Sequence, residues 1–251
     1  MQTNKKYKYE KIKYCFLVFF TIIPLFCVIL DLLFSTIQPD PQYGDSTKNF
    51  DFSIINQSIY FSVWIALSTS VYGILNWINC HTKNMPTWIT GKNNLTHIAT
   101  LNLGTFIVFN LTMIISPNNI VGFNTWYKIL KSILEHILVP IIVIFYYFFF
   151  RQINISTNQY FKKYCWYNLI VISIYLFYVS LRVIMLMNFL PPEQEAFTAF
   201  PYDQLNPYKI GWILFFLGIT AFLVSTILIS TLLNFLSNLI KKSVKKNPNN
   251  P

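Results

Sequence analysis

The sequence predicts an all-α polytopic membrane protein, a bundle of six transmembrane helices. Of its 251 residues, 54% are hydrophobic, 18% are aromatic and only 11% are charged, whereas charged residues make up about 25% of a typical globular chain. So little charge cannot cover a water-soluble surface. The net charge of +10 would indicate nucleic-acid binding in a soluble protein. In this composition it indicates the cytoplasmic face of a membrane, and no nucleic-acid partner is expected.

Six apolar runs are long enough to cross a bilayer, which takes about 20 residues. The third run is the weakest, because Asn102, Asn110 and Thr112 interrupt it. No repeat, Gly-rich linker or charge block divides the chain, so residues 1–251 are predicted to form a single integral membrane domain. The predicted spans are 14–34, 52–78, 98–115, 129–150, 164–187 and 210–240.

The charges between the spans predict the orientation. Fourteen of the 19 Lys and Arg residues precede span one, lie between spans two and three or four and five, or follow span six. The positive-inside rule places those segments, and both termini, in the cytoplasm, and we expect a multi-pass protein of the cell membrane. The first apolar run is longer than the 7–15 residues of a signal peptide and is read as an uncleaved span. The opposite segments hold Asp40, Asp45, Asp51, Glu193, Glu195 and Asp203.

Motifs for metal or cofactor chemistry are not found. Cys15, Cys27, Cys80 and Cys165 are too scattered for a disulfide framework or a zinc site. The sequence also has no H-E-x-x-H and no G-x-S-x-G motif. We therefore expect no metal and no cofactor. His81 and His97 fall in a polar segment between spans two and three and are expected to be solvated.

Polar side chains of three spans are predicted to reach the same depth. Glu135 and His136 lie six or seven residues into span four, about 10 Å below the outer edge at 1.5 Å per residue. Arg182 arrives at a similar depth from the other side, whereas Asp31, near the outer end of span one, is expected to reach the headgroups. Ionisable groups inside a span are costly and mark functional sites. We call the following set in the outer third of the membrane the polar layer: Ser53, Asn56, Gln57, Glu135, His136 and Arg182.

Two interpretations of this layer compete. In the first, Glu135 and Arg182 form an ion pair that only ties spans four and five together. In the second, the layer is a site. Neighbouring helical residues point about 100° apart, so if one of Glu135 and His136 pairs with Lys131 or Arg182, the other can face a cavity. Pro140 withholds a hydrogen bond from the carbonyl of His136, and the resulting polar kink is tolerated only where it is buried or wet.

Four segments resemble one family of membrane proteins. Residues 52–57 (F-S-I-I-N-Q) are similar to its Phe-Thr-x-x-Ser-Asn entry to span two, and residues 134–140 (L-E-H-I-L-V-P) match its Leu-x-His-x-x-x-Pro. Residues 175–182 (Y-L-F-Y-V-S-L-R) resemble its Tyr-x-x-Leu-x-Arg, and 200–207 (F-P-Y-D-Q-L-N-P) its Tyr-Pro-Phe-Leu-Asp/Asn-Pro. The family consists of six-span bacterial proteins related to the androgen-induced and androgen-dependent TFPI-regulating proteins of animals. The resemblance covers about residues 50–240.

This resemblance implies an intramembrane hydrolase. The animal relatives are threonine hydrolases that cleave fatty acid esters of hydroxy fatty acids with a Thr and a His. By position, Ser53 falls at the nucleophile and His136 at the general base. Because the family's Ser-Asn is Asn56-Gln57 here, Ser58 stays open as a rival hydroxyl. A hydroxyl nucleophile needs an adjacent base, and membrane lipids or lipid-like molecules are the expected substrates.

The supporting roles follow from the same layer. The developing oxyanion needs hydrogen-bond donors, for which Asn56, Gln57 and Arg182 are the candidates. Glu135 and Pro140 are expected to support the site structurally. The loop over residues 188–208 contains four prolines and several aromatic residues, which predicts a packed lid rather than a flexible linker. Its residues of note are Pro191, Pro192, Phe197, Phe200, Pro201, Tyr202 and Pro207.

Two alternatives from other classes remain. The chain is similar in size to the six-span binding component of a vitamin importer, so a transport or substrate-binding membrane component is the first. Such components carry a small-x-x-x-small face in span one, but residues 16–34 contain no Gly or Ala. The second alternative is a non-catalytic membrane protein with a structural Glu135–Arg182 pair.

Overall fold

A computed structural model describes residues 2–38, 41, 48–115, 123–150, 154–189 and 200–246. Among these residues there are helices and no strand, so the predicted all-α fold class is confirmed. Six helical segments are long and apolar enough to cross a membrane, and the chain is a multi-pass membrane protein. They are Tyr7–Ile37, Phe61–Thr82, Thr87–Ile115, Trp126–Phe149, Thr157–Asn188 and Trp212–Ile240.

Several of the crossings are built from more than one helical piece. A π-helix, η3, separates α6 from α7, and the fifth crossing passes from α8 through the π-helix η4 and the 3₁₀ turn η5 into α9. The α-helices are α1 (Gln2–Ile37), α2 (Phe50–Gln57), α3 (Phe61–Thr82), α4 (Thr87–Thr90), α5 (Lys92–Ile115), α6 (Trp126–Ile133), α7 (Val139–Phe149), α8 (Thr157–Gln159), α9 (Asn168–Phe189), α10 (Pro207–Ile210) and α11 (Trp212–Lys246). The shorter turns are η3 (Leu134–Leu138), η4 (Tyr160–Tyr164), η5 (Cys165–Tyr167) and η7 (Asp203–Leu205).

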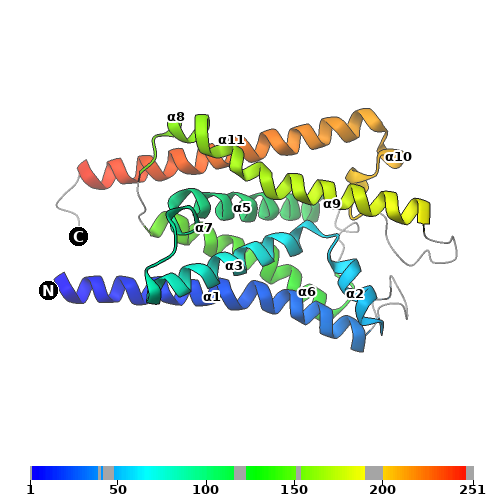
Figure 1. Ribbon diagram of the computed structural model, residues 1–251, viewed down its shortest axis with the longest axis horizontal. Coiled ribbons are helices and arrows are strands. Elements are labelled where there is room, and N and C mark those ends of the chain that lie inside the picture. The colour runs from blue at the N-terminus through cyan, green and yellow to red at the C-terminus, as the bar shows by residue number, and fades with distance from the viewer. Residues whose placement is uncertain are drawn as a thin grey trace.

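The helices run along one long axis, so the bundle has two distinct ends (Figure 1). The beginning of α1 and the end of α11 lie together at one end, which we call the terminal end. The short helices α2 and α10 lie at the other, which we call the α2 end. An even number of crossings returns the chain to the end at which it started. The arrangement therefore agrees with six spans.

The core of the bundle is formed mainly by α1, α3, α5 and α7. Buried Leu17, Tyr72, Ala99 and Val143 belong to one apolar cluster that these four helices share. By contrast, the large apolar side chains of α11, among them Ile213, are mostly exposed. Exposed apolar surface on this scale would be a liability in water. It is what the hydrocarbon of a bilayer requires.

The closest backbone approach in the core is between α1 and α3. A Cβ added to Gly73 would lie 2.6 Å from the backbone N of Thr21 and 2.8 Å from the carbonyl carbon of Phe20. At the same crossing the Ser70 hydroxyl donates to the Thr21 carbonyl oxygen at 2.8 Å. Small residues let helix backbones pack this tightly in membranes. Glycine at position 73 therefore sets the distance between α1 and α3.

The second crossing differs from its prediction at its beginning. The apolar run over 52–78 predicts one continuous helix, but the structure ends α2 at Gln57 and begins α3 at Phe61. No proline or glycine marks this break in the sequence. Ser53, Asn56 and Gln57 consequently lie on a separate short helix and not in the first turns of the span.

Side chains from elsewhere satisfy the backbone groups that the break exposes. The Trp64 indole N–H donates to the Ser58 carbonyl oxygen at 2.8 Å, and the Tyr175 hydroxyl donates to the Ile59 carbonyl oxygen at 2.7 Å. Because Ile59 is fully buried, its carbonyl would otherwise lack any partner, at a cost of several kcal/mol in an apolar environment. Non-helical backbone at membrane depth is tolerated only where it is buried in this way.

Each polar residue that interrupts the third apolar run bonds a carbonyl one turn back in its own helix. Asn110 donates to the Phe106 carbonyl at 2.7 Å, and Thr112 donates to the Val108 carbonyl at 2.9 Å, in each case one turn back. Asn102 bonds the Ile98 carbonyl in the same manner, also at 2.9 Å. Such back-bonding removes most of the cost of a polar group in a helix interior. Polar residues therefore interrupt the apolar run of the third span, but its helix is continuous from Lys92 to Ile115.

Candidate functional site

Helix α2 presents the polar part of the predicted site to the interior. Asn49 caps it by accepting from the backbone N–H of Asp51 at 2.9 Å, as expected of an N-cap asparagine. Its buried residues are Phe52, Ser53, Asn56 and Gln57. A spacing of three to four residues puts such positions on one helical face. The helix therefore turns its polar side toward the bundle.

The Ser53 hydroxyl is buried against α1. Only 3% of Ser53 is exposed, and its Oγ is hydrogen-bonded to the Oγ of Ser35. Ser35 also donates to the Leu32 carbonyl oxygen at 3.1 Å. With the Ser35 proton directed to Leu32, Ser53 is left as the donor between the two hydroxyls.

Two further atoms on α2 have no hydrogen-bond partner among the described residues. They are Asn56 Oδ1, an acceptor, and Gln57 Nε2, a donor, and both are buried. Leaving a buried polar group unpaired costs about 1–3 kcal/mol, and each such group in a native structure requires an explanation. The two atoms are therefore able to bind water or another polar molecule.

The kink predicted at Pro140 takes the form of a π-helix. In η3 the backbone hydrogen bond joins residues five apart instead of four, because the Val139 N–H donates to the Leu134 carbonyl oxygen. Proline at position 140 supplies no N–H and so favours a rearrangement of the preceding turn. Single π-turns inside α-helices are frequent at functional sites. Glu135 and His136 both lie on this turn.

His136 does not point where the hydrolase hypothesis expects. Its ring stacks on Phe109 of α5, with centroids 4.2 Å apart and planes at 16°. Its Nδ1 is buried and has no partner in the described part of the chain. A general base for Ser53 would have to face α2, but the imidazole faces α5 and no hydrogen bond joins it to Ser53.

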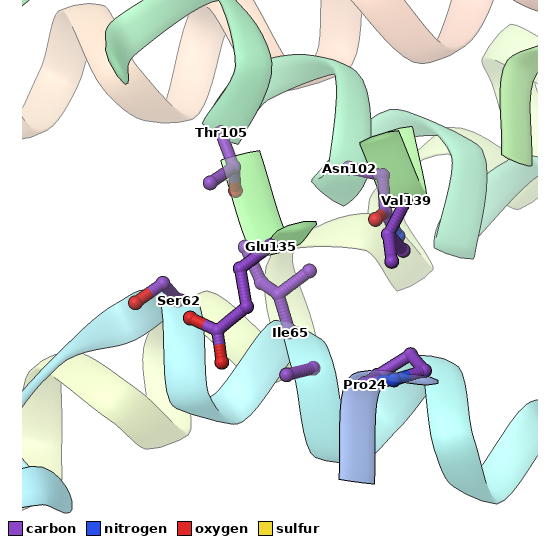
Figure 2. Close-up of a pocket in the computed structure, with 8 residues that line it drawn as sticks. Pro24, Ser62, Ile65, Asn102, Thr105, Glu135 and Val139 are labelled. Atoms are coloured by element: carbon purple, nitrogen blue, oxygen red, sulfur yellow. The ribbon is translucent and has the colours of Figure 1, made fainter. Parts of the chain in front are cut away.

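Glu135 occupies the centre of the bundle instead. Only 6% of the residue is exposed, and neither carboxyl oxygen has a hydrogen-bond partner among the described residues. Figure 2 shows the side chain extended toward α3, between Ser62 and Ile65. The expected Glu135–Arg182 ion pair is not formed. The cavity that Glu135 helps to line has a volume of about 10 Å³, and its other lining residues are Pro24, Ser62, Ile65, Ala66, Asn102, Thr105 and Val139.

A different ion pair is present next to this cavity. Lys131 Nζ lies 2.6 Å from Asp31 Oδ2, and both residues are buried. This corrects the expectation that Asp31 reaches the headgroups. The pair ties α1 to α6, and it leaves Lys131 bonded to a carboxylate other than that of Glu135.

Helix α9 holds the end of α2 in place. Arg182 Nη1 donates to the Ile55 carbonyl oxygen at 3.3 Å, so the guanidinium lies against the backbone of α2. The Tyr178 hydroxyl is hydrogen-bonded to the Ser58 hydroxyl, which also donates to Ile55 O at 2.7 Å. The rival hydroxyl, Ser58, is therefore tied to Tyr178.

The described part of the predicted lid packs over the α2–α3 break. The Tyr202 hydroxyl accepts from the Phe61 backbone N–H at 3.2 Å. Phe200 and Leu205 pack against the apolar cluster of Tyr175 and its neighbours. Burial raises the pKa of Tyr202 to about 12, against the lowering effect of the Phe61 N–H. Pro191, Pro192 and Phe197 lie outside the described residues.

A lateral groove of about 660 Å³ runs along α3 between α5 and α9. Its walls are mostly apolar and include Trp64, Leu67 and Val71, and Ser58 and Tyr178 lie at one end. His97 also lines it, with Nδ1 hydrogen-bonded to Asn168 Oδ1 at 3.2 Å. The expectation that His97 is solvated is therefore wrong, because its side chain packs between α5 and α9. His81 is exposed, as predicted.

Several partners in this region were not predicted. Ser35 and Ser62 carry no sequence signal, because single hydroxyl residues are common in apolar segments. Tyr178 lies in one of the four motifs and Tyr202 in the predicted lid, but the sequence did not predict their contacts with Ser58 and Phe61. The Asp31–Lys131 pair did have a signal. The two residues lie near the same end of spans one and four, and opposite charges at equal depth are expected to pair.

Comparisons with protein-family models, with curated proteins and with solved structures gave no match to this chain. The family resemblance of the four segments therefore stays a prediction.

Proposed function

We propose that this protein is an intramembrane hydrolase that cleaves the acyl ester of a lipid-like molecule, with Ser53 as nucleophile and His136 as general base. The observation that carries the proposal is three of the buried polar atoms of α2 and η3 that have no hydrogen-bond partner among the described residues. These are Asn56 Oδ1, Gln57 Nε2 and His136 Nδ1. A bound ester can accept from Gln57 Nε2 through its carbonyl oxygen, and a hydroxyl group on the same molecule can donate to Asn56 Oδ1.

The donor and acceptor pattern suits an ester with a neighbouring hydroxyl. Gln57 Nε2 can donate to the oxyanion that forms when Ser53 Oγ attacks the carbonyl carbon, and Arg182 is held close by through Ile55. Asn56 Oδ1 can accept from a hydroxyl of the substrate. The Ser53 proton passes to the base, which returns it to the leaving alcohol. Water then releases the acyl group from Ser53 as a carboxylic acid.

The reaction needs Ser53 and His136 to approach one another. In the structure Ser53 is bonded to Ser35, and His136 is stacked on Phe109. Catalytic hydrogen bonds often tighten only in the substrate complex. The π-turn of η3 is the place at which the imidazole can be reoriented, since it already departs from regular helix geometry.

The separation of these two residues also favours a second candidate. A protein that binds a lipid-like molecule without cleaving it needs the same unpaired polar atoms but no Ser–His contact. The hydroxyl pair of Ser53 and Ser35 fits a structural role for Ser53. In this second candidate the polar layer binds the lipid-like molecule and does not cleave it.

Hydrolysis by purified protein in lipid vesicles separates the two. We expect slow release of fatty acid from long-chain acyl esters, including esters of hydroxy fatty acids. His136→Ala should lower the rate about 10²–10⁴-fold, as the loss of a positioned base does, and Ser53→Ala should lower it at least as much. The matched controls are Ser58→Ala and His97→Ala, which should keep most of the activity. Absence of hydrolysis, or equal rates in all four variants, would refute the hydrolase.

We further propose that the terminal end faces the cytoplasm and that the α2 end faces outward in the cell membrane. The Lys and Arg residues concentrated in the segments near the termini support this orientation. In a cysteine-free background, a cysteine added at the C-terminus should react with impermeant maleimide only after the cells are lysed. Labelling in intact cells would contradict the orientation.

A further inference from the structure

Glu135 takes no part in the proposed hydrolysis, yet its carboxyl group is buried inside the described bundle. It is 6% exposed, and both of its carboxyl oxygens lack a hydrogen-bond donor among the described residues. Lys131 is the neighbouring cation, but its ammonium is bonded to Asp31 at 2.6 Å. If Glu135 were ionised, no cation among the described residues would contact its carboxylate directly.

The cavity in front of Glu135 has mixed walls, with apolar Pro24, Ile65, Ala66 and Val139 beside polar Ser62, Asn102 and Thr105. The Asn102 amide donates to Thr69 Oγ1 and to the Ile98 carbonyl, both at 2.9 Å. The Thr105 hydroxyl donates to the Leu101 carbonyl at 3.0 Å. Because their hydrogens are engaged elsewhere, Asn102 and Thr105 leave only acceptors on the cavity wall, and Figure 2 shows the carboxyl group directed toward Ser62 rather than toward these two side chains. Acceptor groups repel a carboxylate but accept a hydrogen bond from a protonated carboxyl group.

The size of the cavity limits what it can hold. Its volume is about 10 Å³, and a cavity needs roughly 10–15 Å³ to hold one water molecule. It therefore has room for about one water and for nothing larger. An ionised carboxylate without a donor is among the most costly groups to place at membrane depth.

We propose that Glu135 and this cavity form an intramembrane proton-binding site, in which the carboxyl group carries an exchangeable proton and shares it with one water molecule. The ligand is the proton itself. Proton release leaves the carboxylate beside Ser62, and proton uptake restores the neutral acid. The site is independent of Ser53 and His136, so it stands whether or not the protein is a hydrolase.

The charged and titratable groups around Glu135 come from three directions. Helix α1 contributes Cys27 and Asp31, helix α6 contributes Lys131, and the described loop contributes Tyr202. His136 follows Glu135 in the same turn but stacks on Phe109. Asp31 and Lys131 offset one another as a pair, so the site as a whole is neutral only when Glu135 is protonated.

Infrared spectroscopy of the full chain in lipid vesicles tests the site. A protonated carboxyl group has a carbonyl stretch well separated from the bands of a carboxylate. At neutral pH we expect this band in the wild-type protein, with a shift in D₂O and a further shift when the protein carries isotope-labelled glutamate. Glu135→Gln, which keeps the shape of the neutral acid, should remove the band. Glu10→Gln, the matched control at an exposed position, should leave it unchanged.

Three results would overturn the site. The first is a wild-type spectrum without the band at neutral pH, and the second is a band that persists in Glu135→Gln. The third is a band that disappears when sodium replaces choline in the buffer, because the carboxylate would then be binding a metal cation instead of a proton. The isotope shift assigns the band to glutamate even if Glu135→Gln fails to fold.

Discussion

Replacing Gly73 with alanine tests the packing that aligns α1 with the rest of the bundle. The added Cβ would lie 2.6 Å from the Thr21 backbone N, 2.8 Å from the Phe20 carbonyl carbon and 2.8 Å from Thr21 Oγ1. Two of these are backbone atoms, so no rotamer change relieves the contact. Ordinary contacts begin at 3.4 Å, so α1 and α3 must separate by close to 1 Å.

The free energy of unfolding should fall accordingly. Overpacking of this kind costs about 1–3 kcal/mol. Straining the Ser70–Thr21 hydrogen bond, 2.8 Å in the structure, adds about 1 kcal/mol. We expect a total loss of about 2–4 kcal/mol, measured by reversible unfolding of purified protein in mixed micelles with increasing dodecyl sulfate.

Gly104→Ala is the matched control, because it also places alanine in a membrane helix but has no atom within 4 Å of the added Cβ. Alanine is the better helix former, by about 1 kcal/mol, so this variant should be as stable as the wild type or slightly more so. Equal stability of the two variants would show that the backbones of α1 and α3 do not pack as described.

Two further predictions concern buried polar contacts. Lys131→Met should destabilise the protein by about 3–5 kcal/mol, because it leaves Asp31 buried without its cation. The double variant with Asp31→Asn should recover much of that loss, and simply additive losses would contradict the pair. Tyr175→Phe removes the donor to the Ile59 carbonyl and should cost about 1–3 kcal/mol, whereas Tyr167→Phe at an exposed position should be neutral. Equal effects of the two tyrosine substitutions would refute the role of Tyr175 at the helix break.

The overall architecture was predictable because membrane-spanning helices obey a simple rule. A span needs about 20 apolar residues, and each of the six runs meets that length. The polar residues of the third run made that span look weaker than it is. The side-chain amides of Asn102 and Asn110 donate to carbonyl oxygens one turn back in the helix. The irregular turn before Pro140 was predictable for a different reason. Proline has no backbone N–H, so the helical hydrogen bond to the His136 carbonyl cannot form.

The break between α2 and α3 was not predictable from local sequence. Residues 58–60 contain neither Gly nor Pro, and the break is stable only because Trp64, Tyr175 and Tyr202 reach its backbone groups. Two of these three donors and acceptors come from segments more than 100 residues away. The contacts that define such a break exist only in the folded bundle.

The side-chain directions in the site were likewise decided by tertiary packing. Adjacent Glu135 and His136 were expected to diverge, and they do. Which of them faces the centre depends on the π-turn and on the ring of Phe109, to which His136 is stacked. The sequence therefore located the turn but left open which of the two residues faces the cavity, and the structure places Glu135 there.

The most direct test of the proposed function is to map covalent labelling by a long-chain fluorophosphonate on the purified protein in lipid vesicles. An activated serine reacts with this probe and keeps the phosphonate, so the labelled peptide can be identified by mass spectrometry. The proposal predicts labelling at Ser53 that is lost in Ser53→Ala, strongly reduced in His136→Ala and retained in Ser58→Ala. No labelling, or labelling that is unchanged in Ser53→Ala, would contradict it.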